Sequence, residues 1–300
     1  MLPLVYHPSY SFALPANHRF PVGKYARLKS ALTTDLADIN HRYFSADADS
    51  SYPLRWHCPD YAHGFIHQQL PSNMVRRIGF PMSAALIERT LAANKGTLLT
   101  AELALKHGLA LHLSGGYHHA HFAQGGGFCI FNDLAMAAQQ LVADGKARRV
   151  LIIDCDVHQG DGTATMLARH PDCITLSVHA ERNYPARKPD SDMDIALPNG
   201  TDDNAYLSAL SDSVELALRF YQPDLVLYDA GVDVHADDEL GHFALSSHAL
   251  LARDKYVLGA CQQRDIAVAA VIGGGYQRDL QAVVNLHRLL FKAAATLNPD

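Results

Sequence analysis

A regular alternation of short apolar segments and long amphipathic segments, starting near residue 109, most strongly limits how this 300-residue chain can fold. Five apolar segments are expected to be strands: residues 110–113, 150–153, 174–178, 225–228 and 267–272. Five amphipathic segments are expected to be helices: residues 131–143, 162–169, 203–221, 246–263 and 277–296. Short apolar strands that alternate with helices are typical of a parallel sheet covered on both faces. The sequence therefore predicts an α/β fold of three layers, α/β/α, around a mainly parallel sheet, without a domain boundary.

Polar or glycine-rich residues follow each of the five predicted strands. They occupy residues 114–119, 154–161, 179, 229–233 and 273–276. In sheets of this kind, ligands bind just beyond the carboxyl ends of the strands. We therefore expect the chemistry of the protein to be concentrated at one edge of the sheet.

The segment that follows the second of these strands is rich in potential metal ligands. Asp154, Asp156 and His158 alternate along the chain, so an extended backbone places them on one side. Carboxylate oxygens beside an imidazole suit a divalent metal such as zinc. Asp154 ends an apolar strand, where an unpaired carboxylate is costly, so it needs a cation or a histidine partner. Asp161 could instead cap the helix expected to begin near residue 162.

A catalytic zinc ion commonly takes three protein ligands and keeps a fourth position open. Asp156 and His158 could supply two of the three. Asp233, which follows the strand at 225–228, is the best candidate for the third, and Asp229 and Asp237 are weaker alternatives.

Two adjacent histidines, His118 and His119, follow the strand at 110–113. The preceding Gly115 and Gly116 allow the backbone to turn, so both rings could reach the same site. Their place at the sheet edge that carries the metal candidates favours a functional role over a solvated surface pair.

Two glycine triplets are each followed by an aromatic residue, Phe128 in one and Tyr276 in the other. Neither triplet has the pattern of a phosphate-binding loop. Phe128 could line a slot, and the Tyr276 hydroxyl could stabilise a developing oxyanion. Cys129 is interpreted as a small core residue, although the nearby histidines leave a thiol function open.

Composition excludes several other classes of protein. The formal charge of -6 argues against a non-specific nucleic-acid binder. Five cysteines without a C-x-x-C pair argue against a disulfide framework and favour a reducing cytoplasm. No apolar run approaches the length of a membrane-spanning helix, and the first residues do not resemble a secretion signal. We therefore expect a soluble protein without membrane or direct nucleic-acid partners.

Taken together, these motifs resemble the zinc-dependent histone deacetylase family, which shares its fold with the arginases. The resemblance covers most of the chain and implies a single catalytic domain over residues 1–300. Three motifs look most similar to the class IV branch and its bacterial relatives: Arg-Ile-Gly-Phe-Pro at 77–81, Asp-Val-His-Gln-Gly at 156–160 and Gly-Gly-Tyr-Gln at 274–277.

The resemblance implies that Asp156, His158 and Asp233 hold zinc. It also implies that Asp154 and Asp161 orient His118 and His119, respectively, through the ring nitrogen that faces away from the substrate. In this interpretation His119 is the general base and acid, His118 has an electrostatic role, and Tyr276 is the oxyanion donor.

The resemblance further implies a substrate channel and a second cation site. The Gly127 carbonyl would accept the substrate amide N–H, and Phe128 and Tyr184 would form the two channel walls; many members have Phe where this chain has Tyr184. A structural potassium ion would lie near Asp154, Ser177 and Val178 and near backbone carbonyls of Asp156 and His158. No equivalent is identified for the acidic rim residue that many members carry.

The function that this resemblance implies is zinc-dependent removal of acyl groups, acetyl or longer, from lysine side chains of proteins or peptides. Deacetylation of small acylated amines such as acetylpolyamines is the alternative. A non-catalytic acyl-lysine-binding homologue and a ureohydrolase with two manganese ions are both disfavoured by the ligand set, the histidine pair and Tyr276. The natural substrate, the acyl length and the oligomeric state are left open by the sequence.

Overall fold

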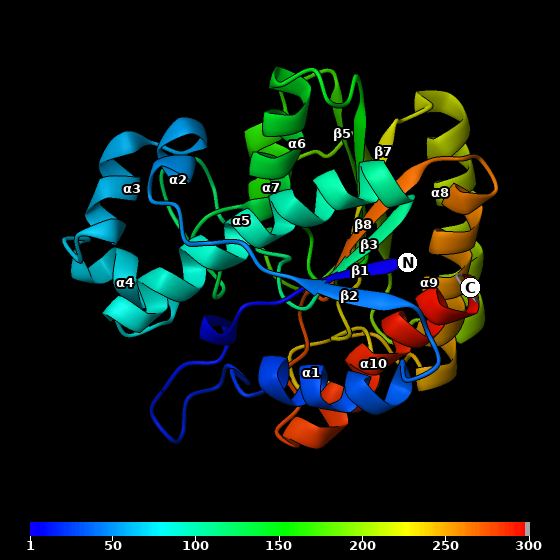
Figure 1. The fold of residues 1–300 in the computed structure, drawn as a ribbon, viewed down its shortest axis with the longest axis horizontal. Helices are drawn as coiled ribbons and strands as arrows, with labels where there is room; N and C mark the ends of the chain where they lie inside the picture. The colour runs from blue at the N-terminus through cyan, green and yellow to red at the C-terminus, as the bar shows by residue number, and fades with distance from the viewer. Residues whose placement is uncertain (298–300) are drawn as a thin grey trace.

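A computed structural model describes residues 1–297 of the protein. An eight-stranded sheet forms its centre, and every strand pairing is parallel (Figure 1). The strand order is β2-β1-β3-β8-β7-β4-β5-β6. The strands are β1 (Leu2–Val5), β2 (His41–Phe44), β3 (Leu109–His112), β4 (Val150–Asp154), β5 (Cys173–Ala180), β6 (Met193–Leu197), β7 (Leu225–Asp229) and β8 (Ala267–Val271).

Helices cover both faces of this sheet (Figure 1). One face packs against α5, α6 and α7, and the other against a layer that contains α1, α8, α9 and α10. Three short helices, α2 to α4, gather at one end of α5. The helices are η1 (Pro8–Tyr10), α1 (Lys24–Asp35), α2 (Ser51–Trp56), α3 (Pro59–Ile66), α4 (Ser72–Ile78), α5 (Ala84–His107), α6 (Asp133–Ala143), α7 (Asp161–Leu167), α8 (Asp203–Tyr221), α9 (Ser247–Gln262) and α10 (Leu280–Leu297).

The predicted three-layer α/β/α architecture is confirmed, and the sheet is wholly rather than mainly parallel. All ten elements predicted from residue 109 onward are present, with ends displaced by at most a few residues. The expected single domain over 1–300 includes three residues, 298–300, that lie outside the described part of the chain. No helix among residues 1–297 is both long enough and apolar enough to cross a bilayer.

The burial of every residue in the central strands explains why these strands could be predicted from the sequence. Every residue of β3, β4, β7 and β8 is buried, because helices cover both faces of these strands. Three helices of this region have side-chain N-caps: Asn132 caps α6, Asp202 caps α8 and Ser246 caps α9. Apolar strands and well-capped helices thus specify the same alternation of elements.

The strand register brings polar side chains into one row at the carboxyl ends of the strands. Asp154 of β4 lies opposite Asp229 of β7 on one side and opposite Ser177 of β5 on the other. Since side chains of register partners point to the same face, two carboxylates and a hydroxyl lie side by side in the buried centre of the sheet. This row is the floor of the candidate site.

Candidate functional site

Two glycines turn the chain so that the adjacent histidines reach the same region. Gly115 and Gly116 have φ angles of 89° and 85°, in the left-handed region that favours glycine. After this turn, the rings of His118 and His119 lie with their centroids 4.1 Å apart, and both side chains are buried. The sequence expectation that both rings could face one site agrees with this geometry.

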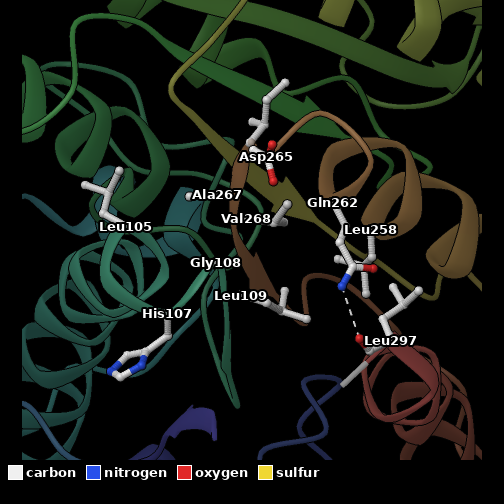
Figure 2. Close-up of a pocket in the computed structure, with 11 residues that line it drawn as sticks. Leu105, His107, Gly108, Leu109, Leu258, Gln262, Asp265, Ala267, Val268 and Leu297 are labelled. Carbon is white, nitrogen blue, oxygen red and sulfur yellow. Dashed lines mark hydrogen bonds between the residues drawn. The ribbon is translucent and has the colours of Figure 1, made fainter. Parts of the chain in front are cut away.

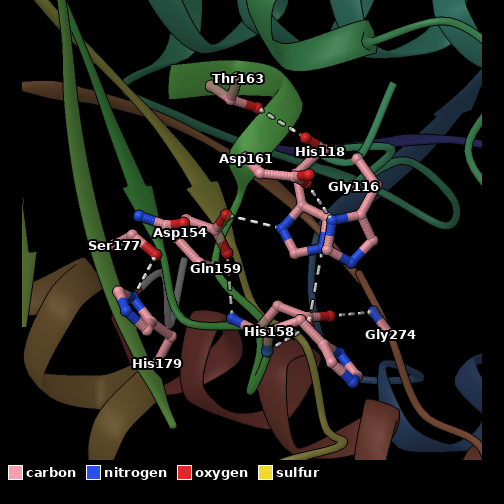
Figure 3. A network of polar contacts seen from close by, with 12 residues as sticks. Gly116, His118, Asp154, His158, Gln159, Asp161, Thr163, Ser177, His179 and Gly274 are labelled. Atoms are coloured by element: carbon pink, nitrogen blue, oxygen red, sulfur yellow. Dashed lines mark hydrogen bonds and ion pairs between the residues drawn. The ribbon is translucent and has the colours of Figure 1, made fainter. Parts of the chain in front are cut away.

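Each histidine has a carboxylate partner at its Nδ1 atom. His118 Nδ1 lies 2.7 Å from Asp154 Oδ2 (Figure 3). His119 Nδ1 lies 2.6 Å from Asp161 Oδ1. The other oxygen of Asp161 lies 3.0 Å from His121 Nε2. Asp161 therefore binds two imidazoles and does not cap helix α7, which begins at Asp161 without a side-chain cap. The capping interpretation of Asp161 is wrong.

Asp156, His158 and Asp233 form a second buried group beside these pairs. His158 Nδ1 lies 2.9 Å from Asp156 Oδ1 and 3.2 Å from Asp233 Oδ2. One ligand atom from each residue lies within 4.8 Å of the others. Asp237, a weaker alternative from the sequence, is exposed and pairs with His235 instead.

The chemistry of this group fits a divalent metal. Asp233 Oδ1 accepts a hydrogen bond from Val157 N, whereas the buried Asp233 Oδ2 makes no hydrogen bond and has His158 Nδ1 3.2 Å away. A buried, unsatisfied carboxylate oxygen is costly unless a cation binds it. Two carboxylates and one imidazole are a ligand set that zinc accepts, so the orphaned oxygen and its neighbours suit a metal site.

The charges within this group depend on one another. Burial, followed by repulsion from Asp156, raises the pKa of Asp233 to about 7. Burial opposes protonation of His158, but Asp156 and Asp233 prevail and raise its pKa to about 10. With no metal bound, a proton on His158 Nδ1 therefore lies between the two carboxylates, where a metal would bind.

The two histidines of the pair have opposite pKa shifts. Burial, and then the positive charges of His118 and His158, lower the pKa of His119 to about 4. Burial also acts against the charge on His118, but Asp154 and Asp156 outweigh it and hold the pKa of His118 well above its usual range. At neutral pH His119 is thus a neutral base and His118 a cation.

Tyr276 is fixed at the edge of this group by its own backbone. Its N–H donates to Asp238 Oδ2 at 2.6 Å, and its ring packs beside Phe128 with centroids 5.8 Å apart. Burial, Asp156 and Asp233 together raise the pKa of the Tyr276 hydroxyl well above its usual range. The hydroxyl therefore keeps its proton at neutral pH and can donate a hydrogen bond.

The two proposed channel walls come from opposite sides of the site. The ring of Tyr184 meets His119 edge-on with centroids 4.7 Å apart, and it is partly exposed. Phe128 has a φ angle of 66°, an unusual value for a residue other than glycine that directs its ring against Gly79. A Cβ at Gly127 would collide with the His119 ring, so this glycine allows the backbone to approach the base closely.

Cys129 is buried, and burial raises the pKa of its thiol well above the usual range. Its Sγ atom lies 3.5 Å from the Gly127 carbonyl oxygen. A neutral, buried thiol is a poor nucleophile, which favours the interpretation of Cys129 as a core residue.

Two buried cations that contact the loops around the site were not predicted from the sequence. Arg253 of α9 donates to the carbonyls of Cys155, Ala230 and Gly231, which belong to the loops after β4 and β7. Lys24 of α1 donates to the Gly273 carbonyl at 3.0 Å. A charged residue on the buried face of a helix, as Arg253 is between Leu250 and Val257, was the one available hint.

Asp229, the other weaker alternative, belongs to a different group, with His118 and Asp154. It is fully buried, and neither of its carboxylate oxygens has a hydrogen-bond partner. Ser177, a predicted potassium ligand, lies beside Asp154 in the register, and its hydroxyl lies 3.0 Å from His179 Nδ1 (Figure 3). Val178, the next residue of β5, is fully buried.

A separate cavity of about 230 Å³ lies at the opposite edge of the sheet (Figure 2). Leu109 and Val268, near the amino ends of β3 and β8, line it together with Leu258 and Leu297. Its few polar side chains, including His107 and Asp265, belong to neither candidate metal group. The carboxyl edge therefore remains the better candidate for chemistry.

A parallel α/β/α sandwich with a buried aspartate–histidine group at its carboxyl edge is an α/β protein with a candidate metal site. The model of the histone deacetylase domain matches residues 18–290. The chain belongs to the histone deacetylase family, and this membership indicates a deacetylase, which is a hydrolase.

Relatives of known sequence agree with this assignment. An uncharacterized protein of Picosynechococcus is 44% identical over 97% of this chain and 98% of its own length. Histone deacetylase 2 of Arabidopsis thaliana is 34% identical over 63% of this chain, and the acetoin utilization protein AcuC of Staphylococcus aureus is 33% identical over 60%. The matched region spans 50% of each of the latter two proteins.

Solved structures share the fold. A histone deacetylase homologue in complex with SAHA superimposes with a TM-score of 0.80 and 25% identity, covering 97% of this chain and 83% of that one. The homologue from Aquifex aeolicus gives a TM-score of 0.79 at 25% identity, covering 98% and 84%. The HD domain of HDA15 gives 0.83 at 19% identity, covering 98% and 92%, and is similar in fold alone.

Proposed function

We propose that this protein is a zinc-dependent deacylase that hydrolyses the amide of acylated lysine side chains in proteins or peptides, and that one catalytic domain spans the chain. The observation that carries the proposal is the contact of the Asp156–His158–Asp233 group with a neutral imidazole, His119, whose ring centroid is 5.7 Å from that of His158. A metal site and a base that adjoin each other are the two requirements for activating water against an amide.

Asp156, His158 and Asp233 would hold the zinc ion, because the orphaned Asp233 oxygen and the Nδ1 atom of His158 face one another. When bound there, zinc would supply Lewis-acid chemistry, which polarises a carbonyl and makes water more acidic. The remaining steps belong to side chains of the protein.

His119 would take the proton of the attacking water and later give it to the leaving amine. Its lowered pKa supports the first task, because the imidazole is neutral at neutral pH. The Asp161 carboxylate at Nδ1 fixes the tautomer that leaves Nε2 free to accept a proton. The positive charge on His118, which Asp154 supports, would favour the negative charge that develops on the substrate.

Tyr276 would donate its hydroxyl proton in a hydrogen bond to the carbonyl oxygen as that oxygen becomes negative. The Gly127 carbonyl would accept the amide N–H and so set the orientation of the scissile bond. Phe128 and Tyr184 would hold the thin aliphatic stem of the lysine between them, a shape that suits an unbranched chain better than a branched one.

Three finer assignments accompany this proposal. A structural potassium ion would lie beside Asp154, Ser177 and Val178, with backbone oxygens of Asp156 and His158 as further ligands. Tyr184 and the motif at 77–81 support placement in the class IV branch. The five free cysteines support a cytoplasmic location.

The experiment that tests the proposal is hydrolysis of a series of lysine peptides acylated with chains from acetyl to long fatty acyl, together with acetylpolyamines. The purified protein is loaded with zinc, and each substrate is measured with and without a chelator. We expect turnover of at least one acyl-lysine peptide that the chelator abolishes and added zinc restores.

A variant separates this activity from a contaminant. Since His119 is proposed as the base, His119→Ala should reduce turnover by at least two orders of magnitude while metal content is retained. Turnover of acetylpolyamines alone would reject acyl-lysine as the substrate, and unchanged turnover in His119→Ala would reject the mechanism.

A further inference from the structure

A cavity of about 540 Å³ adjoins the catalytic tyrosine proposed above. Residues 14–23 line it together with residues 276–278 and Leu280. Phe20 lines this cavity and also packs against Phe128 and Tyr276, with ring centroids 5.4 Å and 6.5 Å away. The cavity therefore lies next to the Phe128 wall and is large enough for parts of a substrate that flank the scissile amide.

Two arginines that line this cavity share one carboxylate. Arg19 Nη1 lies 2.6 Å from Glu239 Oε2, and Arg278 Nε lies 3.1 Å from Glu239 Oε1. One carboxylate offsets one of two guanidinium charges, so the group keeps a net positive charge.

A third arginine lies at the opposite wall. Arg77 is exposed, and its Nη1 donates to the neutral Gln124 side chain at 2.9 Å. A Cβ placed on Gly126 would lie 3.5 Å from both Arg77 Nε and the Tyr184 hydroxyl, so the guanidinium stands beside the channel wall. Both of its partners are neutral, and neither offsets its charge.

Acidic side chains that lie near these arginines already have polar partners. Asp238 is buried and accepts hydrogen bonds from the backbone of Tyr276, Leu240 and Gly241. Asp237 and Asp279 are exposed; Asp237 faces His235 at 3.7 Å, and Asp279 accepts a hydrogen bond from Gln281 N at 2.8 Å. Arginine side chains thus lie beside both proposed channel walls, although the whole chain has a formal charge of -6.

We infer that this arginine rim, formed by Arg19, Arg77 and Arg278, selects acyl-lysine substrates that carry an aspartate or glutamate next to the modified lysine. The inference rests on the proposed function and names its substrate class. Guanidinium groups bind carboxylates through paired N–H donors, and a positive rim repels ammonium groups. Acetylpolyamines, which carry ammonium groups close to the amide, are therefore disfavoured.

The test uses three acyl-lysine peptides that differ only in one flanking residue, which is Glu, Gln or Lys, and an acetylpolyamine as a fourth substrate. An exposed ion pair changes an equilibrium constant by roughly 1.4- to 5-fold. Because the rim would attract the Glu peptide and repel the Lys peptide, kcat/KM should be about tenfold higher for Glu than for Lys. The difference should lie mainly in KM and should shrink as ionic strength rises.

Two variants assign this preference to the rim. Arg77→Gln and Arg278→Gln should each reduce the Glu-to-Lys ratio by about threefold, and the double variant should bring it close to one. Arg148→Gln is the matched control, because Arg148 is an exposed arginine before the amino end of β4, at the opposite edge of the sheet. It should leave the ratio unchanged.

The outcomes separate the inference from the proposed function. Turnover of acyl-lysine peptides with no preference for Glu, or a preference that survives in the double variant, overturns the inference alone. Faster turnover of the acetylpolyamine than of the Glu peptide also overturns it. An absence of turnover with every substrate overturns both.

Discussion

Position along the chain decides which of three aspartates lies beside His158. Asp229 ends β7, and Asp233 and Asp237 follow it at intervals of four residues. Asp229 remains in the sheet row, Asp233 turns toward His158, and Asp237 reaches solvent. The loop path between them, and not their chemistry, determines which carboxylate joins the proposed zinc ligands.

Replacement of Asp233 tests this assignment. Asp233→Ala should lose the metal, because it removes one of three proposed protein ligands. Elemental analysis after dialysis should find about one zinc per chain in the unmodified protein and close to none in the variant. Asp237→Ala is the matched control and should retain its zinc; a full complement in Asp233→Ala would reject the ligand.

The hydroxyl of Tyr276 tests a different part of the site. Tyr276→Phe removes one hydrogen-bond donor to the developing oxyanion and leaves the ring in place, so turnover should fall by about 10²–10³-fold. Zinc content should not change, since the hydroxyl is not a proposed ligand. Tyr221→Phe, at the far end of α8, is the control and should have the same kcat as the unmodified protein. Near-normal kcat in Tyr276→Phe would exclude the oxyanion role.

At the scale of elements, helix α9 connects the loops that carry the site. Arg253 binds carbonyls from the loops after β4 and β7 and pairs with Asp254 at 2.9 Å, while both side chains are buried. These contacts fix the spacing between the strand ends that position Asp156 and Asp233. Removal of the guanidinium would leave three carbonyls without this donor and would leave the buried Asp254 carboxylate, which also accepts from the Tyr228 hydroxyl, without its cation.

Arg253→Leu should therefore lower the free energy of unfolding by about 3–5 kcal/mol, the usual result of breaking a buried ion pair. Urea denaturation measures this loss directly. Arg264→Leu, which removes an exposed arginine just beyond the same helix, should change the free energy by about 1 kcal/mol or less. Equal losses in the two variants would show that the buried contacts add nothing beyond a surface pair.

Burial explains which elements could be predicted from the sequence. The central strands are apolar throughout, whereas the edge strands β2 and β6 are half-exposed and contain polar residues, so their composition does not distinguish them from loops. Strand β1 contains Pro3, which weakens a strand prediction. The three strands absent from the predictions are therefore those whose composition departs from the apolar pattern.

The residues of the candidate site also differ in how well they could be predicted from the sequence. Asp154, Asp156 and His158 are close in sequence, so their alternation along an extended segment could be interpreted locally. Asp233 was the best of three candidates that the strand pattern offered, and the resemblance selected it. The support from Arg253 and Lys24 was not predicted, because contacts between distant segments leave no local pattern. The pairing of β4 with β7 is what brings these segments together.

At the scale of the whole molecule, the fold gathers negative charge at one buried edge. Asp154, Asp156, Asp229 and Asp233 are all buried there, and positive partners such as His118 and His158 offset part of that charge. Burial makes each unpaired carboxylate costly, so this edge binds protons when it binds no metal. Metal binding and proton binding should therefore compete across the physiological pH range.

This competition gives a quantitative prediction. Asp233, with a pKa raised to about 7, and His158, with a pKa raised to about 10, must both be deprotonated to bind a metal. Above pH 7 only His158 still carries its proton, so zinc affinity should rise about tenfold per pH unit. Below pH 7 both protons must leave, and the slope should approach about a hundredfold per unit.

Competition titrations with a chromophoric zinc chelator at about pH 6, 7 and 8 measure both slopes. Calorimetry in two buffers of different ionisation enthalpy counts the protons released on zinc binding, about one at pH 8 and closer to two at pH 6. Asp237→Ala should show the same slopes, since its carboxylate lies outside the group. A zinc affinity that is constant over this range would mean that the protons of His158 and Asp233 do not occupy the metal position.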